Sequence, residues 1–179
     1  MKTSRRALLY SGVGVMALAA GGMLSWFRRN EEGVPSPTAV TALVGNRNLT
    51  DLEGRPRALT DFQGKTLVIN FWATWCAPCR EEIPLFVRLQ KEYAIKNVQF
   101  VGISIDQVDK IRDFAKEFGI NYPLLIGGLD AVEMSRKVGN KAGVLPFTLL
   151  VGRDGRTAIS LVGSITEQDM RRRLELLLK

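Results

Sequence analysis

Residues 66–80, TLVINFWATWCAPCR, combine an apolar run with a pair of cysteines. The nearly continuous apolar stretch Thr66–Trp72 is typical of a strand that is covered on both faces of a sheet. Cys76 and Cys79 follow it directly, at the expected start of a helix over 77–94. A helix N-terminus offers unpaired N–H groups and the positive end of the helix dipole, and both stabilise a thiolate. The stretch therefore predicts a redox-active cysteine pair at a strand–helix junction.

The two cysteines are expected to differ in exposure. Cys76 stands at the first turn of the helix, and Cys79 lies one turn deeper, close enough to form a disulfide without moving the backbone. We therefore expect Cys76 to attack or be attacked by a partner sulfur, and Cys79 to resolve the mixed disulfide. Pro78 suits an early helical position, because its missing N–H has no partner there in any case. Trp75 is expected at the rim of the site, as an apolar ledge for a partner chain.

The composition excludes several other kinds of site. The 179 residues include no histidine and only these two cysteines. Histidine-ligated metal sites, Ser–His or Cys–His nucleophile pairs and multi-bridge disulfide scaffolds are therefore excluded, and we expect no metal and no cofactor. A purely structural disulfide across three residues would close too small a loop to stabilise the fold much.

The net charge of +7 does not indicate nucleic-acid binding. Five of the 25 basic residues lie within residues 1–30, which contain no acid, and the other 20 are matched against all 18 acidic residues. A nearly balanced domain has no electrostatic reason to bind phosphate backbones. We therefore expect no nucleic-acid partner.

Residues 7–27 form an uncharged, mostly apolar stretch. A helix of this length reaches roughly 31 Å, the thickness of the hydrocarbon core of a bilayer. We expect a signal anchor over 1–29 with its transmembrane helix at 7–27, because basic residues before the helix favour a cytoplasmic N-terminus. Two alternatives stay open: residues 17–19 (ALA) resemble a signal-peptide cleavage site, and residues 4–9 (SRRALL) resemble a twin-arginine export signal. All three interpretations place the domain outside the cytoplasm.

The remaining chain divides into a linker over 30–38 and one domain over 39–179. The linker sequence NEEGVPSPT contains two prolines and a glycine, which disfavour regular structure. Residues 39–62 are expected to form short irregular strands. The later segments predict, in order, a strand at 98–105, a helix at 106–118, a short strand at 124–126, a short helix at 130–138, a hairpin of strands at 147–151 and 157–161, and a helix capped by Thr166. A parallel βαβ unit followed by an antiparallel ββα unit describes a three-layer α/β/α sandwich with a mixed central sheet.

Asn70–Arg80 (NFWATWCAPCR) resembles the active-site signature of the thioredoxin superfamily, and more closely that of the TlpA/ResA-like branch of membrane-anchored thiol–disulfide oxidoreductases. The resemblance runs from about Leu43 to the C-terminus, and residues 143–148 (GVLPFT) resemble the second signature of the family. It implies a thioredoxin-like fold in which the Leu145–Pro146 bond is cis and the proline faces the CxxC motif. The residues expected to shape the site around the cysteines are Trp75, Pro78, Leu145 and Pro146.

Two departures from the family pattern concern proton transfer. Thioredoxins place an acid where this chain has Asn70 and a lysine near where it has Gly102, so their acid–lysine relay is absent. Some TlpA/ResA-like members carry a glutamate within the CxxC motif, where this chain has Ala77. The proton of Cys79 must still be accepted, and the candidate acceptors near it in sequence are Glu81, Glu82, Asp106 and water.

The resemblance implies an enzyme that reduces disulfides of exported proteins, with apocytochrome c thiols or a similar client as substrate. It also implies a membrane thiol transporter of the DsbD/CcdA type as electron donor, since a reductase in an oxidising compartment needs such a supply. We expect the protein at the bacterial inner membrane, with its catalytic domain facing the periplasm or extracytoplasmic space. A disulfide oxidase or isomerase, a thiol peroxidase of the same fold and a carrier that holds Cu(I) between two thiolates remain alternatives.

Overall fold

The computed structural model describes residues 35, 37–44, 49–156 and 158–179. The expected transmembrane segment at 7–27, the rest of the signal anchor and most of the expected linker lie outside these residues. Within the described part, no helix has the length and apolar character needed to cross a membrane.

The strand β3 (Thr66–Trp72) lies in the middle of the fold, and all of its residues are buried. Successive side chains of a strand point to opposite faces. Val68 and Trp72 accordingly pack into one hydrophobic cluster, while Ile69 and Phe71 pack into another on the opposite face. Coverage on both faces explains the continuous apolar run, and the predicted bounds of this strand are confirmed.

One mixed sheet is built around β3, in the order β2-β1-β5-β4-β3-β6-β7, where β1 is Leu49–Thr50 and β2 is Pro56–Arg57. On one side, β4 (Val98–Ser104) and β5 (Leu124–Ile126) continue the sheet in parallel. On the other side, β6 (Phe147–Val151) and β7 (Ala158–Val162) form an antiparallel hairpin. The predicted βαβ unit followed by a ββα unit is confirmed.

The segment before β3 differs from its prediction as short strands over 39–62. It contains a helix, a 3-10 turn and two very short antiparallel strands, namely α2 (Pro37–Val44), η1 (Leu59–Phe62), β1 (Leu49–Thr50) and β2 (Pro56–Arg57). Val40 and Leu43 are both buried. Their spacing of three residues places them on one face of a helix, not of a strand, and this explains the difference. The helix also begins inside the segment predicted as the linker.

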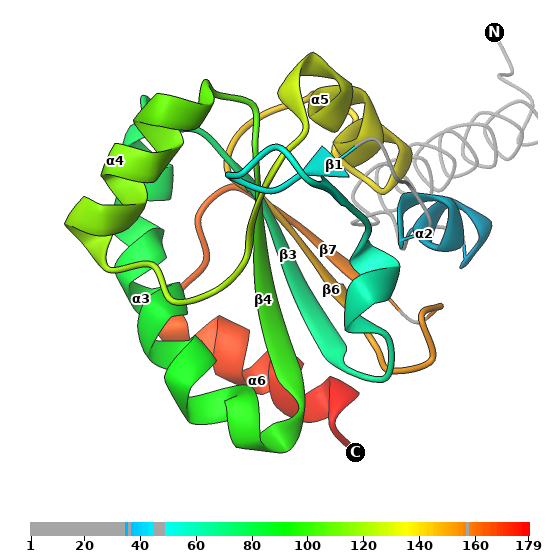
Figure 1. Cartoon of the computed structure of the whole chain (residues 1–179). Helices are drawn as coiled ribbons and strands as arrows, with labels where there is room; N and C mark the ends of the chain where they lie inside the picture. The colour runs from blue at the N-terminus through cyan, green and yellow to red at the C-terminus, as the bar shows by residue number, and fades with distance from the viewer. Residues whose placement is uncertain (1–34, 36, 45–48, 157) are drawn as a thin grey trace, which may run out of the picture. The chain divides into compact units, whose positions relative to one another are not determined.

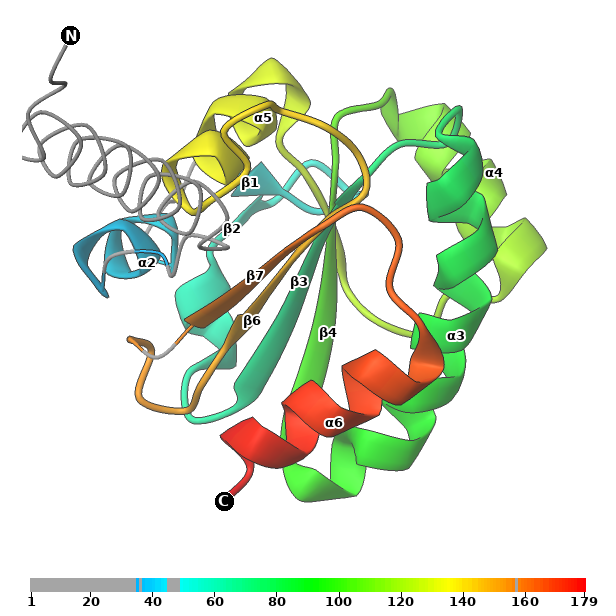
Figure 2. The same cartoon turned by 180° about the vertical axis from the view of Figure 1, so that it is seen from behind.

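Helices cover both faces of the sheet, as the two opposite views show (Figure 1, Figure 2). One face is covered by α3 (Ala77–Tyr93), α4 (Val108–Phe118) and α6 (Glu167–Leu177). The other is covered by α2 and α5 (Gly128–Lys137). The described residues therefore form the three-layer α/β/α sandwich that the sequence predicts.

The helix bounds agree with the prediction to within a few residues. Pro84 lies inside α3 without ending it, and a short 3-10 turn, η2 (Ala94–Lys96), follows that helix. The Thr166 side chain accepts a hydrogen bond from the Asp169 N–H and caps α6, as predicted. α4 begins two residues later than expected, at Val108. The two residues before it are not helical, because Asp106 accepts a hydrogen bond from the Thr74 N–H and Gln107 is the N-cap residue.

Candidate active site

Cys76 is the N-cap residue of α3, at the point where the loop from β3 enters the helix. Its backbone is extended, with φ −81° and ψ 103°, and its Sγ accepts a hydrogen bond from the Cys79 N–H at 3.3 Å. The Cys76 N–H donates to the Ala73 carbonyl, and its own carbonyl accepts from the Arg80 N–H. The sulfur therefore occupies the place at the helix start that a capping oxygen usually takes.

Cys76 and Cys79 are joined by a disulfide, with their Cα atoms 5.3 Å apart. Cys76 retains 5% of its surface and Cys79 none, whereas Trp75 beside them is 66% exposed. Pro78 is exposed in the first turn of α3, the position expected for it. A partner sulfur can therefore reach this disulfide only at Cys76.

The Leu145–Pro146 peptide bond is cis, which confirms the prediction drawn from the resemblance. Phe71 of β3 pairs with Phe147 of β6, so Pro146 lies at the end of the sheet where β3 leads to the cysteines. Pro146 is buried, and its carbonyl accepts from the Gly163 N–H at 2.9 Å. Leu145 packs against the hydrophobic cluster that contains both cysteines. The two sequence signatures thus meet at one end of the sheet.

Glu82 is buried on α3, three residues after Cys79, with only 4% of its surface exposed. Burial raises the pKa of its carboxyl to about 7, although hydrogen bonds from the Asn70 side chain and the Ile165 N–H lower it. The Asn70 Nδ2 donates to Glu82 Oε1 at 2.9 Å and to Thr148 Oγ1 at 3.0 Å. This carboxyl can therefore change its protonation state near neutral pH.

The other two candidate acids lie in different surroundings. Glu81 is exposed on the outer side of α3. Asp106 accepts hydrogen bonds from both the N–H and the hydroxyl of Thr74. Partial burial raises the pKa of Asp106, but the hydrogen bonds from Thr74 and Gln107 outweigh it, and the pKa lies below its ordinary value. Of the three acids, Glu82 is the buried one, and its pKa of about 7 lets it hold or release a proton near neutral pH.

The spacing of Glu82 along the helix already distinguishes it from Glu81 in the sequence. Glu82 stands three residues after Cys79 and four before Phe86, and both of these are buried on α3. Residues at such spacings share one face of a helix. The helical period alone therefore places Glu82 inward and Glu81 outward.

Gly102 shows why the lysine of the thioredoxin relay has no counterpart here. A Cβ atom at this position would lie 2.9 Å from Trp72 Nε1 and 2.7 Å from Leu124 Cδ2. The Trp72 indole, which packs at 5.0 Å against the Phe114 ring, occupies the space that a side chain would need. No side chain of any length fits at position 102 without repacking.

The loop before Pro146 is held by Asn140, a residue that sequence reasoning missed. Asn140 is buried, and its side chain bonds both backbone groups of Val144: Nδ2 donates to the carbonyl at 2.9 Å and Oδ1 accepts from the N–H at 3.0 Å. Nδ2 also donates to Ser135 Oγ at 3.0 Å. These contacts attach the loop to the end of α5, so the entry to the cis bond has a defined position.

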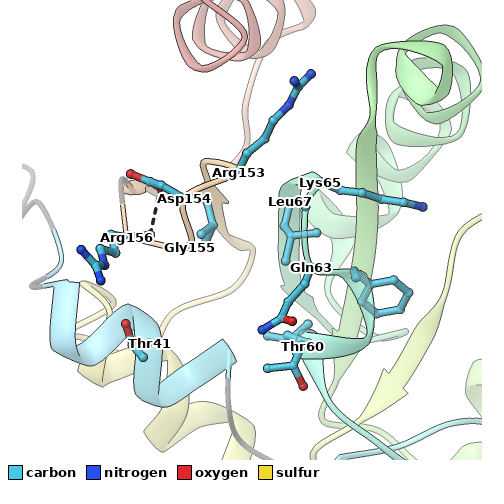
Figure 3. Close-up of a pocket in the computed structure, with 13 residues that line it drawn as sticks. Thr41, Thr60, Gln63, Lys65, Leu67, Arg153, Asp154, Gly155 and Arg156 are labelled. Carbon is cyan, nitrogen blue, oxygen red and sulfur yellow. Dashed lines mark hydrogen bonds between the residues drawn. The ribbon is translucent and has the colours of Figure 1, made fainter.

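A pocket of about 430 Å³ lies between α2, η1 and the β6–β7 hairpin (Figure 3). Its lining includes Leu67 at the start of β3, so it lies at the end of the sheet opposite the disulfide. Two of its basic side chains, Lys65 and Arg153, donate to the Gln99 side chain and the Lys96 carbonyl, which are not part of the lining. The lining residues do not include a cysteine, and we place the chemistry at the disulfide.

No group of three or more His, Cys, Asp or Glu side chains that could hold a metal ion occurs in the part of the chain that the structure describes. The chemistry available is that of sulfur: the Cys76–Cys79 disulfide can accept two electrons and return them by thiol–disulfide exchange. The fold and the site therefore define a thiol–disulfide oxidoreductase of the thioredoxin class.

Comparison with known proteins agrees with this class. The AhpC/TSA family matches residues 41–159. The thiol-disulfide oxidoreductase ResA of Geobacillus thermodenitrificans (strain NG80-2) is 31% identical over 176 residues, which are 98% of each chain. The chain belongs to the AhpC/TSA family and, within the thioredoxin superfamily, to the ResA-like thiol–disulfide oxidoreductases.

Solved structures show the same fold. The thioredoxin-related protein from Neisseria meningitidis serogroup B superposes with a TM-score of 0.66 at 29% identity, covering 72% of this chain and 97% of the other. A thiol:disulfide interchange protein of the thioredoxin family from Chlorobium tepidum TLS gives a TM-score of 0.65 at 28% identity, covering 73% and 91%.

Proposed function

We propose that this protein reduces disulfides of exported proteins through the dithiol form of Cys76 and Cys79. The observation that supports this most directly is the asymmetry of the pair. Cys76 lies at the start of α3 and retains 5% of its surface, while Cys79 has no exposed surface. A nucleophile at the rim and a shielded resolving thiol are the two roles that disulfide reduction requires.

The reaction proceeds in two exchanges. The Cys76 thiolate attacks one sulfur of the client disulfide, forms a mixed disulfide and releases the other client sulfur as a thiolate. Cys79 then loses its proton and attacks Cys76 Sγ, which expels the second client thiolate and leaves the Cys76–Cys79 disulfide. The client gains two electrons, and the protein loses the same two.

Glu82 is the acceptor that we assign to the Cys79 proton. It lies one helical turn after Cys79 on the inner side of α3, and burial raises its pKa to about 7. A base is most effective when its pKa is close to the working pH. In the opposite direction, when an electron donor reduces the disulfide, the same carboxyl returns the proton.

The clients that we propose include apocytochrome c, which the resemblance to the ResA-like branch implies: the protein reduces a disulfide between its cysteines and leaves them as thiols. An apolar surface for a client chain adjoins Cys76: Trp75 is 66% exposed, and Val144 ahead of the cis-proline is 41% exposed. Both residues stand at the sheet end where the cysteines lie, so an extended client segment can contact them while its sulfur reaches Cys76.

The location that we propose is the extracytoplasmic face of the bacterial membrane, with anchoring by the apolar segment at 7–27. A reductase in an oxidising compartment must be kept reduced. We therefore propose a membrane thiol transporter of the DsbD/CcdA type as its electron donor.

Two measurements test the direction of electron flow. We expect a midpoint potential closer to that of thioredoxin, about −270 mV, than to that of the strong oxidant DsbA, about −120 mV. We also expect the Cys79→Ala variant to accumulate mixed disulfides with exported proteins in cells, and a Cys76→Ser variant to accumulate none. A potential near −120 mV together with catalysis of oxidative folding would instead assign an oxidase. Rapid consumption of hydrogen peroxide by the reduced protein would assign a peroxidase.

The proposal that apocytochrome c is a client has a separate test. Cells that lack the protein should lose covalently attached haem from their c-type cytochromes, and added dithiothreitol should restore it. Normal haem attachment in such cells would remove apocytochrome c from the clients without affecting the exchange chemistry.

A further inference from the structure

The loop between β3 and Cys76 is tied to the neighbouring strand through one carboxylate. Asp106, just after β4, accepts two hydrogen bonds on Oδ2: one from the Thr74 N–H at 3.2 Å and one from the Thr74 hydroxyl. The two residues are far apart in sequence, and Thr74 stands only two positions before Cys76. The contact therefore connects the rigid part of the sheet to the reactive cysteine.

Asp106 is itself firmly held. Its Oδ1 accepts from the Gln107 N–H at 3.0 Å, and its own N–H donates to Ser104 Oγ at 3.2 Å. Ser104 is fully buried at the end of β4, and Gln107 is the N-cap residue of α4. The adjacent Ile105 N–H donates to the carbonyl of Trp72. The carboxylate thus has a fixed position at the junction of β4 and α4.

Thr74 is held at its carbonyl as well. The Arg80 Nη1 donates to this carbonyl at 3.4 Å, and the guanidinium stacks over the Phe114 and Phe118 rings of α4, at 4.9 Å and 5.0 Å from their centres. The N–H, the hydroxyl and the carbonyl of Thr74 are therefore all bonded to groups outside the loop. An ordinary loop residue would leave some of these groups to water.

The position of Cys76 depends on this loop, because the Cys76 N–H donates to the Ala73 carbonyl and its Sγ accepts from the Cys79 N–H. A shift of Thr74 would move Cys76 relative to the helix N-terminus that stabilises its thiolate. We infer that Asp106 is a positioning residue for the exchange reaction, and that it acts through Thr74 to hold Cys76 at the N-cap position of α3. The inference concerns the exchange chemistry itself and holds for either direction of electron flow.

Two simpler roles for Asp106 give different expectations. As the proton acceptor for Cys79, it would need a carboxylate that protonates easily, whereas its hydrogen bonds from Thr74 and Gln107 favour the charged form. As a mere source of negative charge, it would raise the pKa of Cys76, so its removal would lower that pKa. The positioning role gives the opposite sign, because a displaced Cys76 loses the helix N–H groups and its pKa rises.

The test uses the full-length chain in detergent, in a Cys79→Ser background where Cys76 is the only thiol. The rate of alkylation by iodoacetamide is measured against pH and gives the apparent pKa of Cys76. We expect Thr74→Val and Asp106→Ala each to raise this pKa by about one unit, which lowers the thiolate fraction at pH 7 about tenfold. Thr74→Ser, which keeps the hydroxyl, should restore the rate to within about twofold.

The double variant and a charge control complete the test. Thr74→Val combined with Asp106→Ala should be no slower than the slower single variant, because both changes remove the same contact. Asp109 is the second residue of α4, and its side chain is 92% exposed and bonded to Arg112. Asp109→Asn therefore removes an equal charge from a nearby position that does not contact Thr74. It should leave the Cys76 pKa unchanged.

Three results would overturn the inference: a wild-type rate in Thr74→Val, a fall of the Cys76 pKa in Asp106→Ala, or additive effects in the double variant. Thermal unfolding of each variant separates a local effect from a loss of fold. If Thr74→Val does not fold, Thr74→Ala removes the same hydroxyl with a smaller side chain, and the same criteria apply to it.

Discussion

The side-chain amide of Asn70 donates to the carboxyl of Glu82 at 2.9 Å, within the buried layer between β3 and α3. Glu82 Oε2 and Asn70 Oδ1 have no hydrogen-bond partner among the described residues. The carboxyl is therefore held in place by few donors, and burial outweighs them in setting its pKa to about 7. An amide in place of an acid at position 70 leaves a single titrating carboxyl in this layer.

Glu82 should make the stability of the protein fall as the pH rises towards neutral. Its pKa is about 7 in the folded protein, against an ordinary value of 4.5. The folded state therefore keeps a proton that the unfolded state has released, so this stabilisation is complete below pH 4.5 and is lost as the pH rises through 7. The free energy of unfolding should decrease by about 3 kcal/mol across this window from Glu82 alone.

Urea unfolding of the oxidised protein at a series of pH values between 4 and 8 gives the free energy of unfolding at each pH. The contribution of Glu82 is the difference between wild type and a variant without this carboxyl. Wild type minus Glu82→Gln should show the decrease, because other titrating groups cancel. Glu81→Gln changes an exposed side chain on the same turn of α3 and is the matched control. Parallel pH curves for wild type and Glu82→Gln would contradict a raised pKa at this position.

The second exchange step should depend on Glu82 more than the first. When the reduced protein reacts with an aromatic disulfide such as Ellman's reagent, attack by Cys76 releases one thionitrobenzoate and attack by Cys79 releases another. In Glu82→Gln, we expect the second release to slow about 100-fold at pH 7, at the low end for general base catalysis, because the Cys79 proton has lost its acceptor. The first release should keep its rate, since Cys76 reacts as a thiolate.

Stopped-flow absorbance resolves the two releases, and Glu81→Gln again serves as the matched control. Equal slowing of both phases would point to a general disturbance of the site. An unchanged second phase would assign the proton to water.

Gly102→Ala should destabilise the fold, because its Cβ would meet Trp72 Nε1 at 2.9 Å and Leu124 Cδ2 at 2.7 Å. Overpacking of this kind costs about 1–3 kcal/mol in the free energy of unfolding. In a Trp72→Phe background, Gly102→Ala should cost about 1 kcal/mol less than it does in the wild-type background, since the smaller ring frees the space of the indole. Denaturant unfolding of the four proteins of this cycle provides the measurement, and an alanine variant as stable as wild type would show that the indole is free to move.

Asn140→Ala should cost about 2 kcal/mol of stability, because it leaves the N–H and carbonyl of Val144 without their buried partner. It should also loosen the entry to Pro146, which faster hydrogen exchange of the Val144 and Leu145 amides would report. Asn121→Ala removes an exposed bond to the Val87 carbonyl and should change stability by less than about 0.5 kcal/mol. An equal loss in the free energy of unfolding in the two variants would mean that the Asn140 contacts stabilise the fold no more than an exposed hydrogen bond does.

Much of the fold could be predicted because its signals are local. The strand Thr66–Trp72 is covered on both faces, so five of its seven residues are apolar, and its bounds follow from the composition of the run. The order of β4, α4, β5 and the final hairpin follows from the same kind of pattern. α2 was missed because a single pair of apolar residues three apart, such as Val40 and Leu43, does not establish a helical period.

The features of the site also divide into those with a local signal in the sequence and those without one. Cys76 and Cys79 are three residues apart in sequence and needed only the strand–helix junction to be located, while the cis bond at Pro146 followed from the family resemblance alone. The contact between Thr74 and Asp106 joins residues that only the parallel pairing of β3 with β4 brings together. Such a contact has no local pattern, since Thr74 in a loop and Asp106 after a strand are each common on their own.

The exposure of a single sulfur has a consequence for the order in which partners bind. Because Cys79 has no exposed surface, the electron donor and the client of the proposed reaction must both form their mixed disulfide with Cys76. The two partners need the same sulfur, so they exclude each other. The protein must release one before it meets the other, and its steady-state kinetics should follow a ping-pong scheme. Each turnover then requires two separate encounters, and not a complex of donor, carrier and client.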